Sequence, residues 1–183
     1  MRIYTQGAAP AATECFHAAP RRREREYLRT ISLTSHSAAE TKKIGRILAK
    51  FLKAGDVVTL QGGLGAGKTT LVKGIAKGLG VPSENAVSSP TFVLVHEYHG
   101  RKRIFHLDWY RLKTLSDTDA DLAEECFSSD AVTLVEWPER GKEIIPAGSL
   151  RIRLSHRGLL SRLLRFSFPR GMGPAVSKAL KKI

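Results

Sequence analysis

The segment from Gly62 to Thr69 limits what this chain can fold into more than any other. It reads GGLGAGKT and fits the pattern G-x-x-x-x-G-K-[ST]. In that pattern, glycine permits backbone angles that other residues avoid, so that main-chain N–H groups converge on one anion. The flanking residues agree, because Asp56 to Gln61 is rich in β-branched residues and apolar residues recur at helical spacing from Leu71 to Leu79. The sequence therefore predicts a strand, a phosphate-binding loop and a helix, in that order.

The side chains at the end of this loop indicate which anion it binds. The helix would direct its N-terminus at the same phosphates. Lys68 would add a full positive charge at the β- and γ-phosphates, and the hydroxyl of Thr69 is placed to bind magnesium. We therefore expect ATP and Mg²⁺ as cofactors. The loop residues expected to bind them are Gly62, Gly63, Leu64, Gly65, Ala66, Gly67, Lys68, Thr69 and Thr70.

A phosphate-binding loop of this kind also needs a carboxylate at the end of a neighbouring apolar strand, where it holds the metal or its waters. Glu136 directly follows an apolar, β-branched run and is the stronger candidate, and Asp108 ends a second run. An acid at either position can also be an ordinary strand-end or turn-capping residue. We predict that Thr69, Glu136 and Asp108 bind the metal, and that Lys68, Glu136 and Asp108 act in catalysis. The pattern leaves open which acid positions the attacking water.

Before the loop, the sequence predicts a short strand and an amphipathic helix. Residues Ile31 to Leu33 alternate like a strand, and Ser37 to Glu40 matches a capping box that satisfies free amides at a helix start. An apolar stripe over residues 44–52 predicts the helix, and Gly55 would end it.

After the loop, the pattern predicts two hairpins with a helix and a strand between them. The first hairpin joins Thr91–Tyr98 to Arg103–Asp108, and the second joins Leu150–His156 to Leu159–Phe168. The acidic stretch around Asp117 to Phe127 is helical, and a buried strand follows it. We predict one α/β domain with a mixed sheet flanked by helices and the nucleotide at the end of the loop strand.

Charge is spread unevenly over the chain and suggests how its ends differ from its body. The formal net charge is +13, yet residues 31–150 hold fifteen basic and fourteen acidic residues, whereas residues 151–183 hold nine basic residues and no acid. We expect residues 1–30 to be a disordered basic extension, residues 31–168 the ATPase domain and residues 169–183 a loose basic tail. No stretch approaches the ~20 apolar residues of a membrane-spanning helix. The two cysteines suggest no disulfide framework or zinc site, so we expect a cytoplasmic protein without a membrane partner.

Four blocks together resemble the TsaE family, the bacterial ATPases of tRNA threonylcarbamoyladenosine biosynthesis. They occur in the family's order and spacing over about residues 31–168, and their conjunction is more specific than the loop alone. The blocks are Gly62 to Thr70 (GGLGAGKTT), Ser89 to Leu94 (SPTFVL), His106 to Leu112 (HLDWYRL) and Leu134 to Pro138 (LVEWP).

The resemblance implies an ATPase that assists a threonylcarbamoyltransferase complex, formed by the TsaB and TsaD proteins, which modifies tRNAs reading ANN codons. By motif, Glu136 matches the acid of V-E-W and Asp108 the acid of D-x-Y-R-L, while Trp137 would lie next to the nucleotide. The segment Ser89 to Thr91 looks like a switch loop that could sense the γ-phosphate. Family members usually carry an acid where this chain has Gly63, which puts any role of that acid in doubt here.

Several alternatives remain open at this point. The basic residues 151–183 could lie along tRNA phosphates or form a solvated face. A small-molecule P-loop kinase would need an acceptor site and a lid, and no lid insert is visible before Glu136. A nucleotide-gated switch without required hydrolysis, and a nonspecific RNA-binding protein, are further readings. His96, His99 and His106 fit surface or hairpin positions better than a metal site, and Arg111 is the only arginine near the motifs that could assist hydrolysis.

Overall fold

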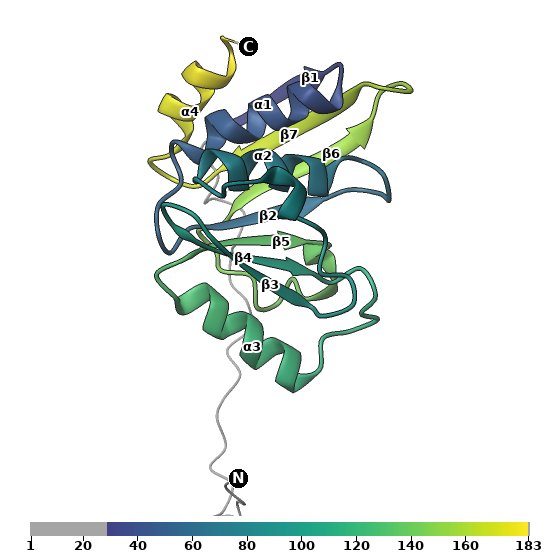
Figure 1. Cartoon of the computed structure of the whole chain (residues 1–183), viewed down its shortest axis with the longest axis vertical. Helices are drawn as coiled ribbons and strands as arrows, with labels where there is room; N and C mark the ends of the chain where they lie inside the picture. The colour runs from purple at the N-terminus through teal and green to yellow at the C-terminus, as the bar shows by residue number, and fades with distance from the viewer. Residues whose placement is uncertain (1–28, 183) are drawn as a thin grey trace, which may run out of the picture.

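A computed structural model describes residues 29–182 of the 183-residue chain. Seven strands and four α-helices, with two short 3₁₀ helices, make up this part of the chain (Figure 1). In chain order these are β1 (Arg29–Ser35), α1 (Ala38–Ala49), β2 (Val57–Gln61), α2 (Lys68–Gly78), η2 (Glu84–Ala86), β3 (Val95–His99), β4 (Arg103–Asp108), α3 (Asp117–Ser128), β5 (Val132–Glu136), η3 (Pro138–Arg140), β6 (Leu150–His156), β7 (Arg162–Phe168) and α4 (Gly173–Leu180).

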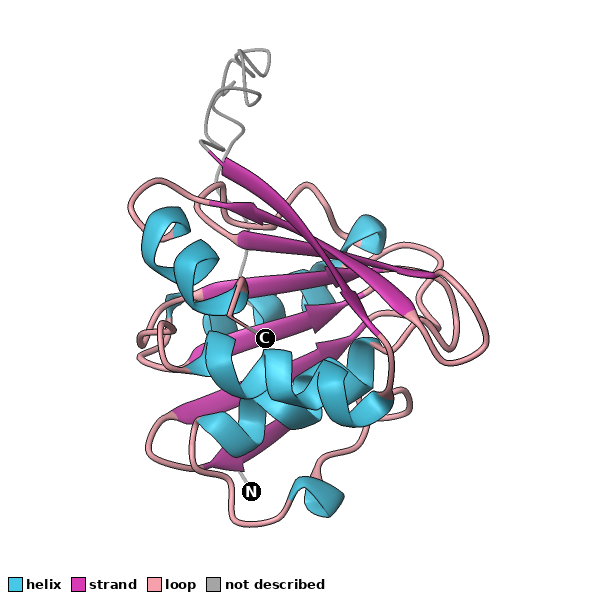
Figure 2. Cartoon of the chain, turned by 90° about the horizontal axis from the view of Figure 1, so that it is seen from above, coloured by secondary structure: helices cyan, strands magenta, loops and turns pink. Residues whose placement is uncertain are grey.

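All seven strands belong to one mixed sheet with the order β1-β7-β6-β2-β5-β4-β3. Strands β6, β2, β5 and β4 run parallel in the centre, and antiparallel strands lie at both sides. The sheet twists strongly from one edge to the other (Figure 2). Because β2, β4 and β5 are parallel, the residues that follow or end them meet at one edge of the sheet. This is the predicted α/β fold.

The helices cover the two faces of the sheet unevenly. Helices α1, α2 and α4 lie over one face, and α3 lies on the other face near β4 and β5 (Figure 1). Helices α1 and α2 touch through glycine, because a Cβ at Gly45 would lie 2.7 Å from the carbonyl oxygen of Leu71. Within residues 29–182, no helix combines the length and apolar character needed to cross a bilayer.

The predicted boundaries differ from the structure in three places. Helix α1 begins as expected, with the Ser37 side chain accepting from the Glu40 amide, but it ends at Ala49 and Gly55 lies in a later turn. In a capping box, the Glu40 carboxylate would accept a hydrogen bond from the amide of the N-cap, Ser37. Here it accepts from the amide of His36, the residue before the N-cap. Strand β3 begins at Val95 because Leu94 adopts a positive φ of 66°.

The third difference is in the second hairpin, where β7 begins at Arg162 and the turn occupies residues 157–161. The charged Arg157 and the turn residue Gly158 suggested a two-residue turn, so the predicted loop was too short. Leu159 and Leu160 are 97% and 74% exposed, so their apolar character reflects no burial in a strand. The strand-loop-helix unit and the acidic helix α3 are confirmed.

The expectation of a loose tail over residues 169–183 is wrong for residues 173–180. These residues form α4, in which Val176 and Leu180 are buried in the main core. The segment was judged by its overall composition, which is polar because of Lys178, Lys181 and Lys182. Composition does not reveal a short apolar stripe on one face of a helix. The expected disordered extension over residues 1–30 lies outside the described residues, apart from residues 29 and 30, which belong to β1.

Candidate nucleotide-binding site

The loop between β2 and α2 is shaped by glycines at two positions where other residues would not fit. Gly67 is the N-cap of α2 with a φ of 100°, a region that L-residues rarely adopt. Gly62 passes so close to β6 that a Cβ would collide with the carbonyl oxygen of Leu154. The backbone can therefore turn sharply from strand to helix, which leaves the first amides of α2 facing the loop.

Lys68 begins α2 and turns its side chain back over the loop. Its ammonium donates to the carbonyl oxygens of Gly62 at 2.8 Å and Gly63 at 3.0 Å, and lies 4.0 Å from the centre of the Trp137 ring. Burial lowers the pKa of Lys68 below its ordinary value of 10.5, while the negative charges of Glu136 and Asp108 act in the opposite direction. The lysine is thus a buried cation held by neutral oxygens and an aromatic face.

Glu136, at the end of β5, is joined to the first turn of α2. The Thr69 hydroxyl donates to Oε1 of Glu136 at 2.8 Å, and Nε2 of His106 lies 3.1 Å from the same oxygen. Glu136 and His106 are 2% and 0% exposed. A buried carboxylate is costly unless it is hydrogen-bonded, so these two contacts both stabilise and orient it.

Asp108 occupies the equivalent position at the end of β4, in register with Glu136 on the neighbouring strand. Its Oδ2 accepts hydrogen bonds from the hydroxyls of Ser89 and Thr91, the latter at 3.0 Å. Its Oδ1 accepts from the amide of Tyr110 at 2.9 Å. The segment that resembles a switch loop is therefore hydrogen-bonded directly to one of the two candidate carboxylate ligands.

These side chains surround a cavity of about 300 Å³ at the N-terminus of α2. Trp137 closes one side, with a φ of 58° and its amide bonded to the Leu60 carbonyl at 3.2 Å, and Tyr110 lies against it with ring centres 5.0 Å apart. The lining residues are Leu64, Gly65, Gly67, Lys68, Thr69, Thr70, Ser89, Thr91, Asp108, Tyr110, Glu136 and Trp137. Of the expected loop residues, Gly62, Gly63 and Ala66 do not line it; the first two bind Lys68, and Ala66 packs in the core.

Two contributors to this site were missed in the sequence. Tyr110 stands between Asp108 and Arg111 in the D-x-Y-R-L block, and only the tertiary structure brings it to Trp137. His106 lies two residues before Asp108 on the same strand, so strand periodicity places both side chains on one face. This two-residue spacing could have placed His106 at the site from the sequence. It does not reveal that the side chain of His106 contacts Glu136.

The remaining candidates from the sequence lie elsewhere. The Arg111 guanidinium lies 4.7 Å from the centre of the Phe92 ring and does not line the cavity. The three histidines have separate partners: His106 is near Glu136, His96 near the Tyr98 hydroxyl, and His99 near Glu97.

The donor set suits a small hard cation. Thr69, Glu136 and Asp108 offer one hydroxyl and two carboxylates at the edge of the same cavity, and Mg²⁺ prefers oxygen ligands. Lys68 stands next to them without blocking this edge, because its ammonium is engaged by the loop carbonyls. The residues therefore fit a magnesium ion bound with phosphate oxygens.

Comparison with known proteins agrees with this geometry. A family model described as "Threonylcarbamoyl adenosine biosynthesis protein TsaE" matches residues 35–163. The chain belongs to the TsaE family. The resemblance inferred from the four sequence blocks is thereby confirmed, and the matched residues contain every member of the TsaE site described above.

Individual TsaE relatives match over most of their length. The chain is 43% identical over 120 residues to the protein from Treponema pallidum, covering 66% of this chain and 87% of the relative. It is 42% identical over 130 residues to the protein from Bacillus subtilis, covering 70% and 79%. Both are named tRNA threonylcarbamoyladenosine biosynthesis protein TsaE. The crystal structure of Bacillus subtilis YdiB superimposes with a TM-score of 0.67 at 31% identity, covering 84% of this chain and 95% of YdiB.

Proposed function

We propose that this protein binds and hydrolyses ATP with magnesium, and that this activity serves threonylcarbamoyladenosine modification of tRNA. The observation that carries the proposal is the hydrogen bond of 2.8 Å between Thr69 and Glu136, next to the loop lysine. It joins the two groups that a P-loop ATPase needs on either side of its metal. The names of the TsaE relatives support the pathway.

The proposed chemistry is attack of water on the γ-phosphate. The water oxygen bonds to the γ-phosphorus while the bond to the β–γ bridging oxygen breaks, and ADP and phosphate leave. Lys68 and the amides of the loop would hold the phosphates, and Thr69, Glu136 and Asp108 would hold the magnesium. Bound magnesium would neutralise triphosphate charge. Glu136 or Asp108 would orient the water, and Trp137 would lie beside the nucleotide.

We propose that turnover is slow until a partner docks. Among the described residues that line the cavity, Lys68 is the only cation, and Arg111 is held against Phe92. Leu64, Phe92 and Val93 near the cavity are 72%, 86% and 60% exposed, which suits coverage by another protein. The partner would be the threonylcarbamoyltransferase complex of TsaB and TsaD, acting on tRNAs that read ANN codons. The basic residues 151–183 would favour a tRNA-loaded complex.

The decisive experiment combines calorimetry with reconstitution. Isothermal titration should detect magnesium-dependent ATP binding, and Lys68→Ala should weaken it at least tenfold, because a charge-assisted contact to phosphate contributes about 1.5–3 kcal/mol. Purified protein should restore threonylcarbamoyl modification when added to the other pathway components, and Lys68→Ala should not. ATP binding that is indifferent to both magnesium and Lys68 would disprove the proposal.

The same preparation separates the competing activities. An ATPase releases inorganic phosphate without any acceptor, whereas a small-molecule kinase transfers the γ-phosphoryl group to its acceptor and forms ADP and a phosphorylated product. A nucleotide-gated switch would still support modification when Glu136 is replaced, provided that ATP binds. The ATPase proposal requires phosphate release without acceptor and loss of modification in the Glu136 variant.

A further inference from the structure

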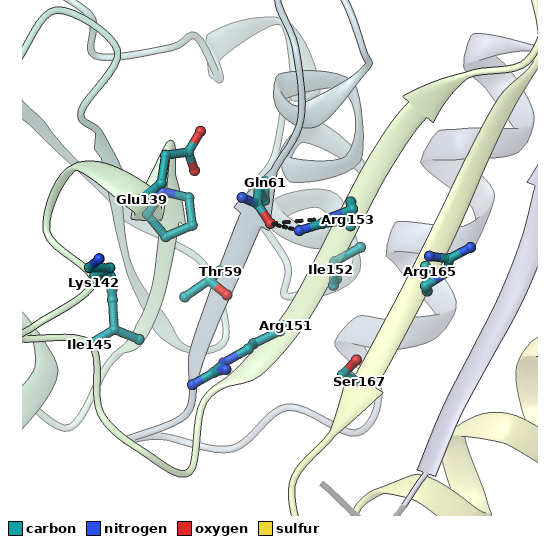
Figure 3. Close-up of a pocket in the computed structure, with 11 residues that line it drawn as sticks. Thr59, Gln61, Glu139, Lys142, Ile145, Arg151, Ile152, Arg153, Arg165 and Ser167 are labelled. Carbon is teal, nitrogen blue, oxygen red and sulfur yellow. Dashed lines mark hydrogen bonds between the residues drawn. The ribbon is translucent and has the colours of Figure 1, made fainter. Parts of the chain in front are cut away.

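The sheet has a second hollow, on the face away from α1 and α2, that the nucleotide site does not use. It has a volume of about 380 Å³ and lies over strands β2, β6 and β7, with the segment 138–145 as one wall (Figure 3). Among the described residues, no α-helix contributes to its lining, and the short helix η3 lies in the wall. Its floor is formed by the side chains that alternate outward from the three strands: Thr59, Gln61, Arg151, Arg153, Arg165 and Ser167.

This hollow is strongly basic. Arg153 and Arg165 stand directly opposite each other on β6 and β7, and Arg151 lies two residues before Arg153 on the same face. Lys142 contributes a fourth cation from the wall, and Glu139 is the only acid among the lining residues that the structure describes. Like charges placed opposite each other on neighbouring strands destabilise a sheet, so the sheet bears a cost that a bound anion would relieve.

One of these arginines, Arg153, is also held in place by a neighbouring side chain. The Arg153 guanidinium donates twice to Oε1 of Gln61, at distances of 3.1 and 2.9 Å (Figure 3). A neutral amide fixes the side chain without cancelling its charge. Gln61 is the last residue of β2 and directly precedes the phosphate-binding loop. Gln61 therefore connects the two regions: its side chain lines the hollow, and its backbone leads into the phosphate-binding loop.

We propose that this hollow binds the phosphate backbone of an RNA strand. Adjacent strands lie about 4.8 Å apart, so the opposed side chains of Arg153 and Arg165 can meet neighbouring phosphates of one strand. Among the described residues that line the hollow, none is aromatic and could stack on a base, which favours contact with phosphates over readout of bases.

The composition of the hollow argues against a protein as its occupant. Protein interfaces have an apolar core enriched in aromatic residues, whereas interfaces with nucleic acids are more polar and much more positively charged. Here Ile145 and Ile152 are already buried within the fold, at 7% and 1% exposure, whereas the three arginines that line the hollow are exposed. The proposed function enters this inference only as support for tRNA as the source of the RNA.

The test measures RNA binding by fluorescence anisotropy as salt is raised from about 50 to 200 mM, a range over which phosphate contacts weaken steeply. The probes are a labelled tRNA transcript and an unrelated single-stranded RNA of equal length, with Mg-ATP present to occupy the loop. The double variant Arg153→Gln/Arg165→Gln should reduce the slope of log affinity against log salt by about 2, and affinity should fall for both RNAs.

The matched control is Lys181→Gln/Lys182→Gln, which removes the same charge from exposed positions after α4. It should change the salt slope much less than the arginine pair does. Arg165→Lys keeps the charge and should retain more RNA binding than Arg165→Gln. Melting temperatures of all variants confirm that each is folded, and a variant that is not folded is replaced by the single change Arg165→Gln.

Three outcomes would overturn the inference. Equal slopes for the arginine and lysine pairs would mean that net charge alone attracts RNA. Competition by inorganic phosphate at RNA-like affinity would mean a small-anion site. Unchanged RNA binding with weaker capture of the partner complex would mean a protein interface. The proposed function stands after any of these outcomes if calorimetry shows that the same variants bind Mg-ATP as the wild-type protein does. If the wild-type protein itself does not bind Mg-ATP, the proposed function is wrong, whatever the RNA measurements show.

Discussion

The Thr69 hydroxyl and the Glu136 carboxylate are hydrogen-bonded at 2.8 Å, although 67 residues separate them in the chain. Thr69 belongs to the first turn of α2, and Glu136 ends β5. The same carboxylate oxygen lies 3.1 Å from Nε2 of His106 on β4. Three elements thus converge on one oxygen, which fixes the carboxylate beside the phosphate-binding loop.

We expect Glu136→Gln to abolish most ATP hydrolysis while the protein stays folded and still binds ATP. The amide can keep contacts with Thr69 and His106, but it cannot accept a proton or hold a cation as a carboxylate does. Loss of a positioned acid–base group typically costs about 10²–10⁴-fold in rate. Phosphate release measures the rate, and calorimetry measures binding. The control is Glu139→Gln, an exposed acid three residues away; wild-type rates in Glu136→Gln would contradict the assigned role.

The contact between α1 and α2 makes a separate prediction about stability. A Cβ at Gly74 would lie 2.8 Å from the Cα of Lys42, so Gly74→Ala should force the helices apart. Overpacking of this kind costs about 1–3 kcal/mol, against a gain of up to about 1 kcal/mol from helix propensity. Urea unfolding should show a lower midpoint. Gly63→Ala is the matched control, because nothing lies within 4 Å of its Cβ and its φ is not positive; equal midpoints for both variants would refute the steric argument.

Helix α4 should be a structural element and not a removable tail. Leu180 is 1% exposed in the main core, so Leu180→Ala should lower the free energy of unfolding by about 2–5 kcal/mol. Lys182→Ala, two residues later and exposed, should leave the melting temperature nearly unchanged. Truncation after residue 168 should destabilise the whole domain. Truncation would therefore confound a test of RNA binding by the basic C-terminal residues, because loss of binding could reflect loss of folding. Substitutions of exposed residues avoid this problem. A truncated protein with the wild-type melting temperature would show that α4 does not contribute.

Cys126 should react slowly as long as the protein is folded. It is 4% exposed, and burial raises the pKa of its thiol from 9.0 to about 11. Only the thiolate reacts, so at pH 8 ionisation alone should slow a disulfide reagent about a hundredfold relative to an ordinary thiol. The Cys15→Ser variant leaves this single thiol to be followed by absorbance. Denaturant should restore fast reaction, whereas fast reaction without denaturant would contradict the burial.

The sign of the associated pH dependence follows from the same shift. As pH rises from about 9 towards 11, the unfolded chain loses the thiol proton and the folded chain keeps it. The folded state then binds more protons, so the free energy of unfolding falls over this window. Below about pH 9 both states keep the thiol proton, and the titration of Cys126 takes nothing from stability. Cys126→Ala should remove that part of the alkaline decline.

Local sequence determined the parts of the site that depend on neighbouring residues. The glycines, Lys68 and Thr69 are contiguous, and a strand before them and a helix after them are readable from periodicity. Glu136 and Asp108 were identified as candidate acids because each ends an apolar strand, and parallel strands end at one edge. The four blocks that resemble the TsaE family are likewise short, and each is read without knowing its spatial neighbours.

Tertiary structure decided what depends on contacts between distant segments. The sequence could not reveal that Thr69 binds Glu136, that Tyr110 lies against Trp137, or that α4 buries Leu180 in the core. Nor could it show that Arg153 and Arg165 face the same open surface, because the register of β6 against β7 sets that pairing. The physical reason is common to all of these. Backbone preferences act over a few residues, whereas burial and hydrogen bonding are settled only when the sheet brings its strands together.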